Sequence, residues 1–107
     1  MGNVQKLFGK KIRMIRRSRE MTQERLAELS GLSLQYIGEI ERGRRNPSLT
    51  SIELLSAALD LPIAGLFDLE EFRMTSEQLR RILVNQVETA DEDRLRSFFA
   101  IAQVFFR

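Results

Sequence analysis

The chain has 107 residues, of which 43% are hydrophobic and 30% charged, a composition typical of a small globular protein. It contains neither cysteine nor histidine, which excludes disulfides, Cys/His zinc sites and a histidine general base. No apolar run approaches the roughly 20 residues that span a bilayer, and the basic N-terminal segment lacks the apolar core of a secretory signal. We therefore expect a cytoplasmic protein with one small domain and an appendage.

Positive charge is concentrated in the first half of the chain. Residues 1–47 hold eleven Lys and Arg against five Glu, a formal charge of +6, whereas residues 48–107 hold six Arg against ten acids, a charge of −4. Such asymmetry is expected when one face binds a polyanion, because phosphate neutralisation supplies much of the affinity for nucleic acid. A solvated charged face on an amphipathic helix is the alternative.

The first half of the chain shows three predicted helices. The first covers residues 3–19, where Phe8, Ile12 and Ile15 share one face. Two short helices follow over residues 23–30 and 34–42.

Short polar residues and glycines mark the ends of the short helices. Thr22 and Ser33 are candidate N-caps, and Gly31 stands where a left-handed residue is needed to reverse the chain. Beyond the proline at position 47, Ser48 can cap a fourth helix, and Pro62 suits the first turn of a short fifth helix. Three apolar side chains of that fifth helix are expected to close the core: Ile63, Leu66 and Phe67.

The pair of short helices resembles the helix-turn-helix of the Cro/C1-type (XRE) repressors, and the resemblance extends from about Ile12 to Phe67. Ala27 lies where two helices meet closely, whereas Ser30 departs from the usual apolar residue. Four residues fall on buried positions of the family: Leu26, Leu32, Ile37 and Ile40. The resemblance implies an all-α fold, with a five-helix lambda-repressor-like domain in residues 1–68 that binds the major groove of double-stranded DNA.

The outward face of the third predicted helix supplies candidate base-reading residues. Gln35 could pair through hydrogen bonds with the N6/N7 edge of adenine, and Glu39 could accept a hydrogen bond from the N4 amino group of cytosine. Leu34 could contact a thymine methyl group, and Ser33 could bind a base or serve only as an N-cap. Gly38 offers no side chain, and we interpret it as allowing close approach to the groove.

Basic and polar residues around this helix are candidate phosphate contacts. In the family, the position of Gln23 contacts phosphate and braces the reading helix, although an ordinary exposed residue is the alternative. Tyr36 could reach a phosphate or pack its ring on the preceding helix. The complete predicted set is Arg19, Gln23, Tyr36, Arg42, Arg44, Arg45 and Asn46. The resemblance also implies a partly buried structural ion pair between Arg16 and Glu41.

After an acidic connector at residues 69–74, a second segment begins. Thr75 and Gln78 fit a capping box, and residues 75–107 are predicted to form a two-helix hairpin whose last helix is apolar almost all round. Such a hairpin cannot bury its own phenylalanines, so it must pack on its own chain or on another. We expect a homodimer interface formed by Leu79, Ile82, Leu83, Leu95, Phe98, Phe99, Ala102, Phe105 and Phe106.

These observations predict a dimeric, sequence-specific DNA-binding regulator, most simply a repressor that binds a two-fold operator. The alternative is an antitoxin or antirepressor-like module whose C-terminal helices bind a different protein. An enzyme is not expected, because the acidic clusters lie at helix ends or in the connector and lack ligands at metal-binding spacing. No cofactor, metal or membrane contact is predicted.

Overall fold

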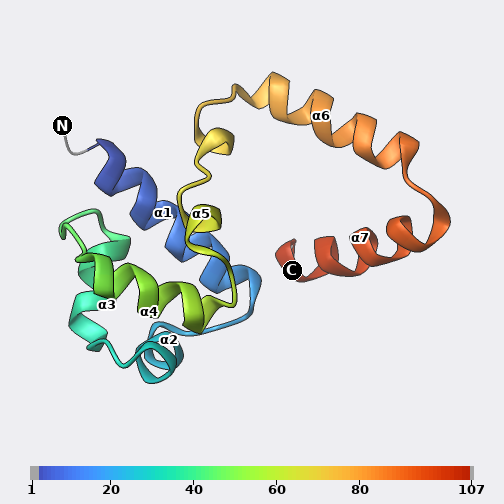
Figure 1. The fold of residues 1–107 in the computed structure, drawn as a ribbon. Coiled ribbons are helices and arrows are strands. Elements are labelled where there is room, and N and C mark those ends of the chain that lie inside the picture. Colours follow the sequence, from blue (N-terminus) through green and yellow to red (C-terminus); the bar gives the residue numbers. More distant parts are fainter. Residues whose placement is uncertain (1–2, 107) are drawn as a thin grey trace. The chain divides into compact units, whose positions relative to one another are not determined.

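The computed structural model describes residues 3–106 and, over that range, is composed of helices and the loops that join them (Figure 1). The chain divides into two compact units, one that extends to Phe72 and one that begins at Arg73. The all-α fold class predicted from the sequence is confirmed. None of the described helices is long and apolar enough to cross a membrane.

The first unit contains the five predicted helices, and its loops begin and end close to the predicted residues. Thr22, Ser33 and Ser48 each accept a hydrogen bond from the backbone N–H three residues later, so all three are N-caps. Pro62 also occupies an N-cap position, one residue before the fifth helix rather than inside its first turn. The helices are α1 (Asn3–Ser18), α2 (Gln23–Ser30), α3 (Leu34–Glu41), α4 (Leu49–Leu59) and α5 (Ile63–Leu66).

The core of this unit lies where α1 packs on α3 and α5, and where α2 packs on α3 and α4. Leu66 closes it, as predicted, but Ile63 is exposed because it lies on the outer side of the short α5. Phe67 is half-exposed and rests its ring against Phe8, with 5.0 Å between the ring centroids. The buried apolar cluster is Phe8, Ile12, Ile15, Leu26, Ile37, Ile40, Ile52, Leu55, Leu59 and Leu66.

The first unit extends further than the predicted boundary at residue 68. Leu69 is buried, and a 3-10 turn, η1 (Glu70–Phe72), follows it directly. Nζ of Lys11 on α1 lies 2.6 Å from Oε1 of Glu71. The predicted connector at residues 69–74 is therefore wrong for its first four residues, because an apolar anchor and an ion pair attach them to the first unit.

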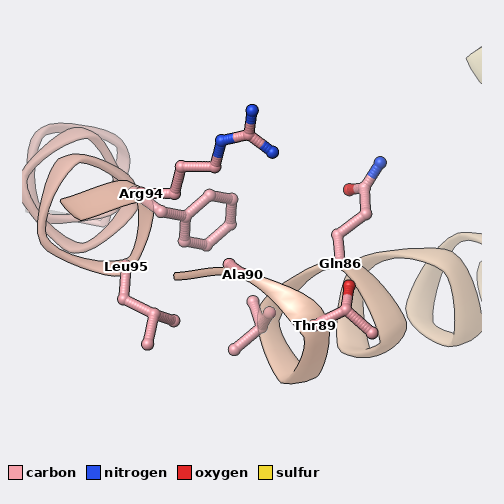
Figure 2. A pocket seen from close by; sticks show the side chains of 7 residues that line it. Gln86, Thr89, Ala90, Arg94 and Leu95 are labelled. Carbon is pink, nitrogen blue, oxygen red and sulfur yellow. The ribbon is translucent and has the colours of Figure 1, made fainter. Parts of the chain in front are cut away.

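The second unit consists of α6 (Ser76–Thr89) and α7 (Glu92–Phe105). The capping box between Thr75 and Gln78 is present, and the helices spread apart from their turn as an open pair (Figure 1). A hollow of about 310 Å³ lies at this turn, where Gln86 and Arg94 extend to one side (Figure 2). No side chain in the described part of α6 or α7 is buried. This unit therefore lacks a core of its own.

Candidate nucleic-acid interface

Helices α2 and α3 form the predicted helix-turn-helix (Figure 1). Gly31 ends α2 in the left-handed conformation, with φ of 77°, which reverses the chain toward the N-cap of α3. Ile37 and Ile40 anchor α3 in the core, with exposed fractions of 0% and 1%. Leu34 and Gln35 lie on the opposite, exposed face. The periodicity of α3 thus separates a buried face from a face that is open to a ligand.

The carboxylate of Glu41, at the end of α3, is the centre of a buried polar network. Arg16 on α1 donates two hydrogen bonds to it, from Nε to Oε2 at 2.7 Å and from Nη2 to Oε1 at 2.9 Å. Gln23 at the start of α2 donates from Nε2 to Oε1 at 3.0 Å, and Arg13 adds a longer contact at 3.5 Å. The Glu41 side chain is completely covered. The predicted pair is therefore present, and the network joins α1, α2 and α3.

The network also determines the charge state of its members. Burial raises the pKa of Glu41, but hydrogen bonds from Arg16 and Gln23 and the charge of Arg16 outweigh that effect and leave the pKa below its ordinary value. The hydrogen bond to Glu41 is the main reason that the pKa of Arg16 is raised. Both side chains are thus ionised at neutral pH. Arg16 also donates from Nη1 to the carbonyl oxygen of Met21, which ties the α1–α2 loop to the same group.

A glycine in α1 permits the approach of α1 to α3. Gly9 is buried, and a Cβ atom placed there would lie 2.3 Å from the carbonyl oxygen of Ile40 and 2.8 Å from that of Glu41. Gly9 is not among the residues predicted from the sequence. A signal existed, because Gly9 follows Phe8 inside a predicted helix, where glycine is costly unless close packing requires it.

Two predicted base-reading residues, Gln35 and Glu39, are hydrogen-bonded to each other on the exposed side of α3. Gln35 donates from Nε2 to Oε1 of Glu39 at 3.1 Å, and Arg45 donates from Nε to Oε2 of the same carboxylate at 2.8 Å. The guanidinium carbon of Arg45 also lies 5.1 Å from the ring centroid of Tyr36. We call Tyr36, Gln35, Glu39 and Arg45 the α3 surface cluster. The i, i+4 spacing of Gln35 and Glu39 indicates their pairing, but the sequence holds no comparable signal for Arg45.

The remaining base-reading candidates occupy different environments. The Ser33 hydroxyl accepts from the N–H of Tyr36 as an N-cap, and Leu34 is 44% exposed. Gly38 does not leave the helix surface bare, because it is buried and its missing Cβ faces the guanidinium of Arg42 at 3.0 Å. The small size of Gly38 makes room for the Arg42 side chain, and close approach of α3 to the groove at this position stays a prediction.

The predicted phosphate contacts differ in their exposure to solvent. Arg19, Arg44 and Asn46 are exposed in loops, and Arg42 is exposed at the end of α3. Gln23 is partly buried, because its amide braces Glu41, so the first turn of α2 offers chiefly its backbone N–H groups to an anion. Within residues 3–106, no cluster of acidic side chains could hold a metal ion.

Comparisons with known proteins agree with this geometry. The sequence profile of the family described as helix-turn-helix matches residues 12–66. The immunity repressor protein of Bacillus phage phi105 is 40% identical over 70 residues, which are 65% of this chain. This chain spans about half of that repressor, 48% of its length.

Two solved structures extend the comparison. The restriction-modification controller protein C.AhdI from Aeromonas hydrophila is 45% identical, with a TM-score of 0.57 over 58% of this chain and 94% of that one. A SinR protein/SinI protein complex matches at 26% identity, with a TM-score of 0.59 over 90% of this chain and 94% of the matched chain.

Proposed function

Because the chain belongs to the helix-turn-helix family of Cro/C1-type (XRE) transcriptional regulators, we propose that it is a repressor that binds a two-fold operator as a homodimer. The observation that carries this proposal is the exposed face of α3, which the Glu41 network holds in a defined orientation on α1 and α2. A rigid helix with an open polar face is the element that this family places in the major groove. The name of the phage relative, an immunity repressor, supports repression.

The distribution of positive charge also supports DNA binding at the exposed face of α3. Arg42 and Arg44 are exposed at and after the end of α3, Arg19 is exposed in the loop between α1 and α2, and all three belong to the basic half of the chain. Each arginine that neutralises a phosphate releases counterions, so binding should weaken as salt concentration rises. We assign base readout to Ser33, the N-cap of α3, and to Leu34 and Gln35 in its first turn. The phosphate contacts are assigned to Arg19, Gln23, Tyr36, Arg42, Arg44 and Asn46.

Dimerisation is assigned to the second unit. Phe98, Phe99 and Phe105 on α7 are 46%, 67% and 53% exposed, and Phe106, the C-cap residue of α7, is 87% exposed. Apolar surface of this extent on helices without a core marks an interaction surface. A two-fold dimer would place two copies of α3 on half-sites with centres roughly 10 base pairs apart, or a multiple of that spacing.

A different protein partner is the second candidate for this surface. The match to the SinR/SinI structure covers 90% of the chain, and that structure is a complex of two proteins. This supports an interaction module in which the α6–α7 pair binds another protein and DNA binding is regulated by that contact.

The test combines sizing with DNA binding. Purified protein is sized, and its affinity for random and selected duplexes is measured at two salt concentrations. We expect a dimer that prefers a two-fold sequence, and Phe98→Glu should yield a monomer with a weakened preference. Ser97→Glu adds the same charge to a different side of α7, at 100° per residue, and should leave both properties unchanged. A monomeric parent protein with only non-specific, salt-sensitive binding would overturn the proposal.

A further inference from the structure

We propose that Arg45 is a base-reading residue, and that Glu39 positions Arg45 and Gln35 rather than contacting a base itself. This inference rests on the proposed function, because it assumes that α3 enters the major groove. It assigns Arg45 a role in sequence choice instead of the phosphate contact expected from its position in a loop. It also replaces the direct contact of Glu39 with cytosine.

Both oxygens of the Glu39 carboxylate already accept a hydrogen bond in the free protein. Its Oε1 accepts from Gln35 and its Oε2 accepts from Arg45, and the side chain is only 21% exposed. A cytosine amino group would have to share an oxygen with one of these donors, on a side chain that is mostly covered. Glu39 is therefore suited to holding its two neighbours in place, and the positive charge of Arg45 offsets the repulsion between this carboxylate and DNA phosphates.

The guanidinium of Arg45 lies along α3 rather than away from it. Its Nε is bonded to Glu39 in the second turn of the helix, and its carbon lies above the ring of Tyr36 in the first turn. In the docking geometry of helix-turn-helix proteins, the N-terminal part of the recognition helix contacts the bases. The backbone of Arg45 thus lies in the loop after α3, but its guanidinium lies beside the part of α3 that contacts base edges in this docking geometry.

The unused groups of the α3 surface cluster match specific bases. Arg45 is half-exposed and retains its two Nη groups, which form a planar edge with two donors. That edge is complementary to O6 and N7 of guanine, the commonest specific contact of arginine in the major groove. Gln35 retains its Oε1 and one amide hydrogen, which are the acceptor and donor required by adenine N6 and N7. The cluster should specify one guanine and one adenine in each half-site.

The experiment selects duplexes from a randomised library with the full chain and its variants, and compares base preferences position by position. Arg45→Lys keeps the charge but loses the planar fork. We expect it to lower the preference for one guanine in each half-site by roughly 10-fold or more, with little change in affinity for random duplexes. Glu39→Ala should lose the same guanine preference, together with part of the adenine preference of Gln35. At the guanine position, the double variant should lose no more than Arg45→Lys alone. Arg44→Ala is the matched control, which should weaken binding to all sequences equally.

Other outcomes of this selection would contradict either the role of Arg45 or the proposed function. If Arg45→Ala weakened all duplexes equally and reduced the salt dependence by about one phosphate contact, Arg45 would be a phosphate contact and the inference would be overturned. It would also be overturned if Glu39→Ala changed the preference at a base pair other than those that Arg45→Lys and Gln35→Ala change. If the parent protein selected no sequence at all, the proposed function itself would fail. Thermal melts of each variant check that the first unit remains folded.

Discussion

The backbone of α1 at Gly9 faces the carbonyl oxygen of Ile40 on α3 so closely that a Cβ atom there would lie 2.3 Å from that oxygen. Ile40 directly precedes Glu41, which receives the two hydrogen bonds from Arg16. The close approach at Gly9 and the ion pair therefore join the same helices, α1 and α3. The orientation of α3 depends on both.

Gly9→Ala should destabilise the protein by about 3 kcal/mol, in the upper part of the range for overpacked sites, because backbone rather than a flexible side chain blocks the new methyl group. Urea unfolding measures the change. Gly65→Ala is the control, since its new Cβ would meet only side-chain atoms at 3.8 Å. Equal stability of the two variants would contradict the close approach of α1 to α3.

Arg16→Ala should lower the free energy of unfolding by about 3–5 kcal/mol, because it leaves the buried carboxylate of Glu41 without its main partner. It should damage DNA binding at the same time. Arg44→Ala changes an exposed side chain, so its stability should stay within about 0.5 kcal/mol of the parent while DNA affinity falls. The structural role of Arg16 would be abandoned if thermal melts showed both variants to be as stable as the parent.

Acid should remove the stabilisation that Glu41 provides. Its pKa is lowered in the folded protein from an ordinary value of 4.5, so the folded state binds the proton less readily than the unfolded state. The contribution is complete above about that ordinary pKa and is lost as pH falls through the lowered pKa. Glu41→Gln lacks this group, so the stability difference between parent and variant should shrink in acid. A difference that stayed constant across this range would contradict a lowered pKa.

Gly38→Ala should stabilise the protein by about 0.5–1 kcal/mol, because alanine favours the helix interior and the exposed guanidinium of Arg42 can move aside. Gly31→Ala is the contrasting case: nothing lies within 4 Å of its new Cβ, but its φ is +77°. That backbone conformation should cost roughly 1 kcal/mol or more with alanine. Calorimetric melts should therefore move in opposite directions, and a loss of stability in Gly38→Ala would mean that Arg42 is held firmly.

Local chemistry explains why the sequence alone predicts the helices of the first unit. Thr22 and Ser33 cap helices through bonds that span three residues, and Gly31 supplies a left-handed turn at its own position. These signals act within one or two turns, so they are visible without knowledge of distant segments. The pairing of Arg16 with Glu41 is not local, and the sequence indicates it only through resemblance to a family.

Contacts between distant segments belong to the tertiary structure. The α1–α3 approach at Gly9, the attachment of Glu71 to Lys11 and the placement of Arg45 over Tyr36 all depend on distances that no periodicity encodes. By itself, the sequence determines an all-α helix-turn-helix chain with a basic first half and an apolar last helix. Only the folded first unit decides which polar groups of α3 are already bonded and which remain free for DNA, because hydrogen bonds form only between groups that packing brings together.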